Sequence, residues 1–112
     1  MKDVIDLFKY RVAVGIVNKQ LRESILINDK SMTMIYLNND FQVKYGKAWN
    51  SGREETLPNT TLENIILLTD YFDLSIEKYF KKVNQVTPEQ INSAIANKER
   101  LTKMYNQLVN NE

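Results

Sequence analysis

The chain has 112 residues and a mass of 13.1 kDa, enough for one domain of ordinary size with an appended helix and too little for a two-domain enzyme. Hydrophobic residues make up 43% and charged residues 26%, so a core can form and global disorder is excluded. The sequence contains no cysteine and no histidine, which excludes disulfides, thiolate zinc sites and imidazole general bases. Fifteen basic and fourteen acidic residues leave a net charge of +1. We expect no enzymatic activity, no cofactor and no metal.

The sequence offers no segment for a membrane. No apolar run reaches the roughly 18 residues that a bilayer crossing requires. Residues 1–10 alternate charged and apolar side chains, whereas a signal peptide has an uninterrupted apolar centre. We expect a cytoplasmic protein with no membrane partner.

Helix breakers are few in this chain, with three glycines and two prolines. Their scarcity predicts an all-α fold of long helices joined by short loops. In the first part of the chain, apolar residues at helical spacing predict a helix that begins between residues 2 and 12 and ends near Asn28 and Asp29.

Two short helices are predicted next. Ser31 is a good N-cap for a helix over 32–39, and the polar residues 38–40 supply a turn. A further helix is predicted over 42–49, ending where Gly52 can adopt the left-handed conformation that closes a helix.

The second half of the chain carries three helix-start signals, each a serine or threonine N-cap that follows a turn. In the last of them, proline stands at the first helical position and glutamine at the capping-box position. The predicted caps and helices are Thr61 with 62–72, Ser75 with 76–82 and Thr87 with 88–110.

The two short predicted helices, joined by a tight turn, have the layout of a helix-turn-helix DNA reader. The residues that follow, over 50–53, 61–66 and 69–80, resemble the second half of the phage repressor and Cro type (XRE) helix-turn-helix family. In that family a glycine-containing turn ends the recognition helix, a capped helix ends in a tyrosine-phenylalanine pair, and a serine caps the last short helix. The resemblance covers 12–82 and is most specific over 60–80.

The resemblance implies an all-α, five-helix, lambda-repressor-like helix-turn-helix domain with an additional long C-terminal helix. Residues 1–85 would form the DNA-binding domain with an N-terminal helical extension, and residues 86–112 a C-terminal helix for packing or dimerisation. The implied function is sequence-specific transcriptional regulation, as a repressor or autoregulator of a phage, plasmid or other mobile element. The protein would read the major groove of a palindromic double-stranded operator with helix 42–49, as a homodimer.

The charge distribution favours DNA contact in one segment. Residues 30–53 hold four basic residues and one acidic residue, whereas residues 54–85 hold three and six. Because the first turns of a recognition helix enter the major groove, we assign base edges to Gln42, Lys44 and Tyr45. Polar and basic residues around them can bind phosphate oxygens. The predicted phosphate contacts are Lys30, Ser31, Thr33, Lys47, Asn50, Ser51 and Arg53.

Some residues depart from the family pattern. Gly46 lies inside the predicted helix 42–49, where glycine costs up to about 1 kcal/mol relative to alanine. Glu54 and Glu55 stand where phosphate contact favours basic residues. Adjacent loop acids without an organised partner are usually solvated, so we predict solvated side chains there and no metal site. The resemblance to the family is therefore closer over the scaffold helices than over the predicted DNA-reading helix.

The predicted helix 62–72 is apolar on two sides and needs cover on both. We expect that cover from the C-terminal helix or from the N-terminal segment, with the other of the two, or the same helix of a second copy, forming a homodimer. A monomer whose tail closes its own core is the alternative. The residues expected in this packing are Leu67, Tyr71, Ile91, Ile95, Leu101, Tyr105 and Leu108.

Two functional classes stay open from the sequence. The first is the DNA-binding regulator. The second is a protein-interaction module on the same scaffold, such as an antitoxin or a phage-encoded inhibitor, with weak or no DNA binding. Gly46 and the weakly basic surface favour this second class. The aromatic residues Phe41, Trp49 and Phe72 are expected to anchor the core and not to stack on bases.

Overall fold

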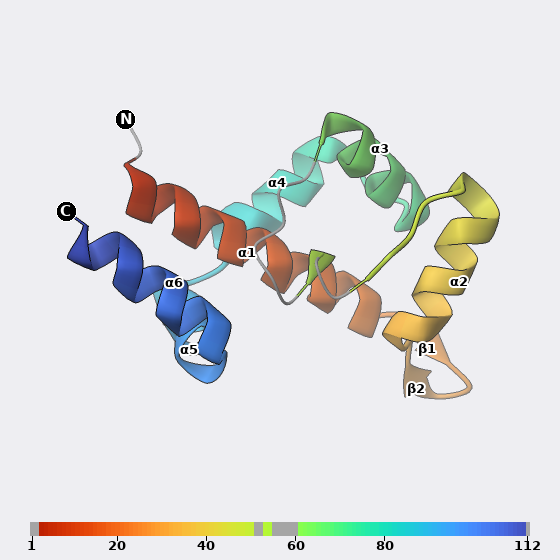
Figure 1. The fold of residues 1–112 in the computed structure, drawn as a ribbon. Helices are drawn as coiled ribbons and strands as arrows, with labels where there is room; N and C mark the ends of the chain where they lie inside the picture. Colours follow the sequence, from red (N-terminus) through yellow and green to blue (C-terminus); the bar gives the residue numbers. More distant parts are fainter. Residues whose placement is uncertain (1–2, 51–52, 55–60, 112) are drawn as a thin grey trace.

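The computed structural model describes residues 3–50, 53–54 and 61–111, and this part of the chain is mostly helical (Figure 1). Six helices and one two-stranded hairpin form over the described residues. In chain order they are α1 Val4–Glu23, β1 Leu26–Ile27, β2 Lys30–Ser31, α2 Met34–Tyr45, α3 Leu62–Tyr71, α4 Ile76–Gln85, α5 Pro88–Asn97 and α6 Glu99–Asn110. Within the described part of the chain, no helix combines the length and apolar character needed to span a bilayer.

Helix α1 ends earlier than the sequence predicted. It stops at Glu23, and the antiparallel hairpin that follows pairs Leu26 with Ser31. Asn28 and Asp29, predicted to lie near the helix end, form the hairpin turn with positive φ angles of 52° and 67°. Asn and Asp adopt positive φ more readily than most residues, and two-residue hairpin turns of type I′ require it at both positions. The predicted helix end is therefore wrong.

A single helix, α2, replaces the two short helices predicted in this region. Ser31 belongs to β2, and the cap is Thr33, whose side chain accepts a backbone N–H in the first turn at 3.1 Å. The predicted turn over 38–40 lies inside the helix. Gly46 ends α2 in the left-handed conformation, with φ 68°, which glycine adopts at no steric cost. The predicted helices over 32–39 and 42–49, and the turn between them, are therefore wrong.

The helix starts of the second half are confirmed. Thr61, Ser75 and Thr87 each accept a backbone N–H from the residue three positions later, at 3.1–3.2 Å, and Thr87 belongs to a complete capping box. Two ends differ from the prediction. Helix α4 continues to Gln85, and the long C-terminal helix breaks at Lys98, where φ is −123° and ψ is 112°. The break lets α6 turn back, so that α5 and α6 both pack on α1.

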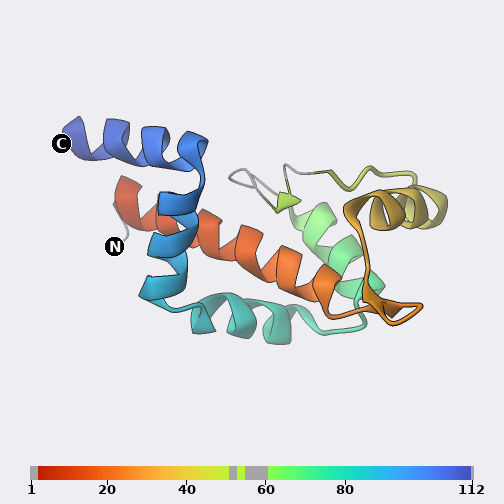
Figure 2. The same cartoon turned by 90° about the horizontal axis from the view of Figure 1, so that it is seen from below.

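Helix α1 carries two apolar clusters, one on each half. Figure 2 shows the two C-terminal helices beside the N-terminal half of α1. The N-terminal half packs against α5 and α6, and the C-terminal half packs against α4 and the rest of the domain. Helix α2 lies at the end of the molecule away from both termini (Figure 1). The buried residues of the first cluster are Phe8, Val12, Ile95 and Leu101. Those of the second cluster are Ala13, Val14, Val17, Met32, Leu37, Phe41, Trp49, Leu68, Tyr79 and Val83.

Candidate functional site

The residues predicted to read bases lie in the last turn of α2 and contact other parts of the chain. The Tyr45 hydroxyl donates to the Asp70 carboxylate at 2.6 Å, and Lys44 Nζ lies 5.1 Å from the centre of the Tyr71 ring. The Gln42 amide donates to a side chain one turn earlier in the same helix, at 3.1 Å. Tyr45 and Lys44 thus fasten α2 to α3. Burial, followed by the hydrogen bond to Asp70, raises the pKa of Tyr45 from 10 to about 12.

The predicted base-reading residues also lie at the opposite end of their helix from those of a recognition helix. Recognition helices present their N-terminal residues to base edges. The C-terminal end of a helix carries a partial negative charge, which disfavours an approach to phosphates. Gln42, Lys44 and Tyr45 stand at that end, whereas the first turn of α2 holds Met34, Ile35 and Tyr36.

The residues predicted to contact phosphate mostly have partners within the chain. The Ser31 hydroxyl donates to the Glu23 carbonyl at 2.9 Å, and Thr33 caps α2. Lys47 forms an exposed ion pair with Glu63 of α3 at 3.6 Å. Of the other predicted contacts before Arg53, Lys30 and Asn50 are exposed, and Ser51 lies outside the described residues.

Arg53 stacks on aromatic rings and is only partly accessible. Its guanidinium carbon lies 5.4 Å from the Trp49 ring centre and 5.5 Å from that of Phe41. The guanidinium donates to the Ala48 carbonyl at 3.1 Å and to the Asn64 side chain at 3.4 Å. Burial lowers its pKa. Arg53 therefore links residue 48 to α3, and its contact with a phosphate stays a prediction.

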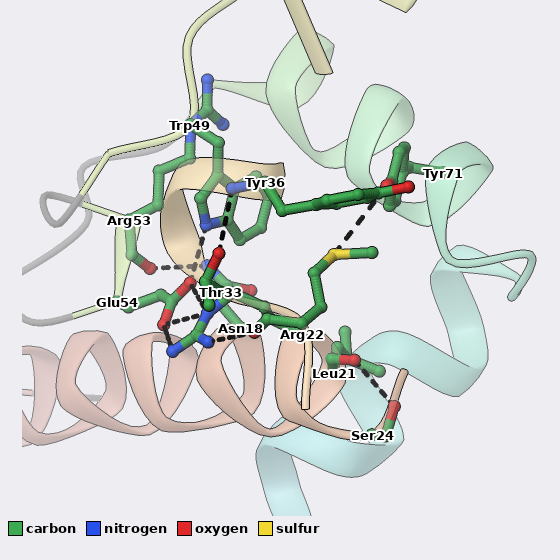
Figure 3. Close-up of polar contacts among 11 residues, drawn as sticks. Asn18, Leu21, Arg22, Ser24, Thr33, Tyr36, Trp49, Arg53, Glu54 and Tyr71 are labelled. Carbon is green, nitrogen blue, oxygen red and sulfur yellow. Dashed lines mark hydrogen bonds and ion pairs between the residues drawn. The ribbon is translucent and has the colours of Figure 1, made fainter. Parts of the chain in front are cut away.

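A buried ion pair that the sequence did not reveal joins this segment to α1 (Figure 3). Arg22 Nε and Nη2 donate to the two carboxylate oxygens of Glu54 at 2.9 and 3.0 Å, and Trp49 Nε1 donates to the same carboxylate at 2.7 Å. The Glu54 side chain is 0% exposed. Solvation of Glu54 was therefore a wrong prediction, because its partner lies 32 residues earlier in the chain. Glu55 lies outside the described residues.

A second set of hydrogen bonds extends this network to α4. Asn18 Nδ2 donates to the Arg53 carbonyl at 2.8 Å, and the Tyr79 hydroxyl donates to Asn18 Oδ1 at 2.6 Å. Burial raises the pKa of Tyr79 above its ordinary value. Asn18 and Tyr79 are both buried, and their bonds connect α1 with α4 and with Arg53, in the segment that follows α2. The described part of that segment is residues 46–50 and 53–54.

Aromatic packing completes the attachment of α2, as the sequence predicted for the core anchors. Phe41 and Trp49 are buried with ring centres 5.5 Å apart, and the Phe72 ring lies 5.9 Å from Trp49. The Tyr71 hydroxyl donates to Asp40 of α2 at 2.7 Å, and burial, followed by this bond, raises its pKa above the ordinary value.

One exposed face of α2 is mostly apolar and carries no charge. Val43 is 85% exposed, Ile35 77% and Tyr36 45%. Asn39 and Gln42 are exposed beside them and carry no charge. We call these five residues the α2 stripe. The sequence did not reveal it because the predicted turn over 38–40 divided the helix, whereas spacings of four and eight residues along one continuous helix would have indicated a single face.

The residues predicted for tail packing divide between two places. Leu67 and Tyr71 pack against the larger cluster, and α2 covers Tyr71. The C-terminal helices and the N-terminal segment, expected to cover α3, cover each other: Phe8 lies in one cluster with the tail residues. The predicted tail residues in that cluster are Ile91, Ile95, Leu101, Tyr105 and Leu108.

The chemistry of the α2 stripe is suited to binding by apolar contact and neutral hydrogen bonds. Among the described residues, no group of three or more potential ligands could hold a metal ion. Comparison of the chain with protein-family models found no match, and searches of curated proteins and of solved structures found no similar chain. Its function is therefore inferred from its own surfaces.

Proposed function

We propose that this chain is a protein-interaction module that binds a partner protein through the α2 stripe and catalyses no reaction. One observation carries the proposal. Val43 and Ile35 are the most exposed of the large hydrophobic side chains in the described part of the chain, and they lie on one face of one helix. Apolar patches that stay exposed on small domains mark interaction sites.

The charge of the stripe favours a protein over a nucleic acid. Nucleic-acid interfaces are rich in Lys and Arg, whereas the cores of protein interfaces are depleted of charge. The two charged residues of α2, Asp40 and Lys44, are both engaged with Tyr71 of α3. A partner on the stripe therefore meets no charge that it must desolvate.

The contacts that hold α2 in place support the same function. The network of Arg22, Glu54 and Trp49 fixes the segment that follows α2, and Tyr45 and Tyr71 fasten the helix itself. A helix held in this way presents its outer face in one orientation, which lowers the entropy lost when a partner binds.

Site-specific photo-crosslinking tests the proposal. The photoreactive residue p-benzoylphenylalanine replaces Val43, and in a matched control it replaces Lys81, which is exposed on α4. Irradiation of cells that produce the protein should join position 43, and not position 81, to another polypeptide chain, and Ile35→Lys should remove the product. Equal yields at both positions, or a product that survives Ile35→Lys, would contradict the proposal.

Sequence-specific DNA binding by a regulator with the lambda-repressor-like arrangement is the second candidate. The capped helices α3 and α4, which carry the most specific part of the family resemblance, favour it. A fluorescence anisotropy titration with DNA from the protein's own promoter region, at two salt concentrations, tests it. Salt-sensitive and sequence-selective binding that Lys44→Ala with Lys47→Ala weakens, and Lys78→Ala with Lys81→Ala does not, would favour the regulator. Absence of binding at low salt would eliminate it.

A further inference from the structure

The α2 stripe has an internal symmetry centred on Asn39. Ile35 lies four residues before Asn39 and Val43 four residues after it, so the three side chains follow one another along the same face at single-turn spacing. The polar residue stands between two apolar residues of similar shape. A sequence of this form is complementary to itself when two helices run in opposite directions.

We propose that the partner of the α2 stripe is a second copy of this chain, paired with the first about a two-fold axis that passes beside Asn39. The inference rests on the proposed function, because it names the partner of the same surface. In this arrangement Ile35 of each copy contacts Val43 of the other, and the two Asn39 amides hydrogen-bond across the axis. Antiparallel helices also place opposite ends of their dipoles side by side.

The electrostatics and the central amide fit a second copy. At a two-fold axis the same residues of both copies come close together, so any charged residue there would be repelled by its counterpart. The exposed residues of the α2 stripe carry none, in a protein that is 26% charged. A buried Asn that can bond only to its counterpart fixes the register of paired helices, as it does in coiled coils.

The size of the surface sets the strength of the pairing. Helix α2 has 12 residues, which span roughly 18 Å. Such a contact lies at or below the lower end of the roughly 1,200–2,000 Å² that stable complexes bury. The dimer should therefore be reversible, with a dissociation constant in the micromolar range.

Helices α5 and α6 take no part in this proposed dimer contact. The apolar residues of α5 and α6 are already packed on α1, and α2 stands at the opposite end of the molecule (Figure 1). The rival apolar surface is a groove of about 270 Å³ beside the termini, lined by Val4 and Leu7 of α1 and Leu108 of α6. A test has to separate these two surfaces.

The absence of cysteine in the sequence allows a test by single introduced thiols. Helix axes about 8–10 Å apart, each with a Cα radius of about 2.3 Å, leave about 3.4–5.4 Å between Cα atoms that face each other beside the two-fold axis. Disulfides join Cα atoms roughly 4.4–6.8 Å apart, so Asn39→Cys should oxidise to a dimer. The two copies of position 35 are about 12 Å apart in the direction of the helix axes, as are the two copies of position 43. This distance is too long for a disulfide.

The expected pattern is specific to this register. Asn39→Cys alone should form several-fold more disulfide dimer than the control Leu7→Cys. Ile35→Cys alone and Val43→Cys alone should form no more than the control, but an equal mixture of the two should form the mixed dimer. In sedimentation equilibrium the unmodified chain should dimerise at micromolar concentration, and Val43→Lys should weaken the dimer about tenfold or more, since it buries an unpaired charge.

Several outcomes would overturn the proposal. They are no excess of dimer for Asn39→Cys over Leu7→Cys, strong self-crosslinking of Ile35→Cys, or a monomer in sedimentation up to roughly 100 μM, well above the micromolar constant that the interface size implies. The photo-crosslinking experiment separates this failure from failure of the proposed function. A product that joins position 43 to a different polypeptide, with a monomeric chain in sedimentation, would overturn the dimer and leave the interaction module standing. No product and no dimer would overturn both.

Discussion

Replacing Gly46 by alanine distinguishes the single helix α2 from the helix-turn-helix that the sequence predicted. Gly46 has φ 68° and ψ 21°, and a Cβ atom added to it would meet nothing within 4 Å, so the cost is confined to the backbone. The left-handed conformation costs an L-residue roughly 1–2 kcal/mol. The reduced freedom of the unfolded chain returns about 0.4–1 kcal/mol. Gly46→Ala should therefore lower the free energy of unfolding by about 1 kcal/mol, and Gly46→Asn by less, because asparagine tolerates this conformation.

Urea unfolding measures this change. The chain has one tryptophan, Trp49, which is 1% exposed, so its fluorescence reports unfolding close to the substituted position. For a slope of about 1–3 kcal/mol per molar urea, the midpoint should fall by about 0.3–1 M. The opposite sign would refute the reasoning. If Gly46 were inside a helix over 42–49, alanine would stabilise the protein by up to about 1 kcal/mol.

Three further predictions concern contacts within the chain. Glu54→Ala leaves the buried Arg22 without its ion-pair partner and should cost about 3–5 kcal/mol in urea unfolding, whereas Arg22→Met combined with Glu54→Leu should cost much less than the sum of the two single changes. A cost below about 1 kcal/mol for Glu54→Ala would contradict the buried pair. Leu101→Ala should cost about 2–5 kcal/mol because Leu101 is 4% exposed in the cluster on α1. That cost should not vary with protein concentration, and a cost that did vary would place the tail in an interface between copies. At alkaline pH, the raised pKa of Tyr45, about 12 against 10 in the unfolded chain, means that the folded state favours the neutral phenol. Its contribution to stability is complete below pH 10 and falls as the pH rises through 12, and Tyr45→Phe should remove that part of the dependence. An ultraviolet titration in which Tyr45 ionises near 10 would contradict its partial burial together with its bond to Asp70.

The sequence by itself determined the features that depend on a few neighbouring residues. The N-caps Thr61, Ser75 and Thr87 each act on an N–H three residues away, so their signals are complete within one turn of chain. The burial of Phe41 and Trp49 also followed from residue type, since large aromatic side chains in a small domain have few places outside the core. The mostly helical class followed from the scarcity of breakers.

Only the tertiary structure decided what residues 24–54 do. Asn28 and Asp29 can end a helix or form a hairpin turn, and Gly46 can sit in a helix or close one, and local preferences do not choose between these. The choice is made by contacts across long stretches of chain, above all Arg22 with Glu54, which are 32 residues apart, and Asn18 with Tyr79, which are 61 apart. If these buried polar groups had no partners, the folded protein would lose several kcal/mol of stability. Their hydrogen bonds therefore determine the conformation of the segment after α2, where part of a recognition helix was predicted. Bonds from Tyr45 to Asp70 and from Tyr71 to Asp40 fasten α2 as one continuous helix, and in that helix Ile35 and Val43 share an exposed face.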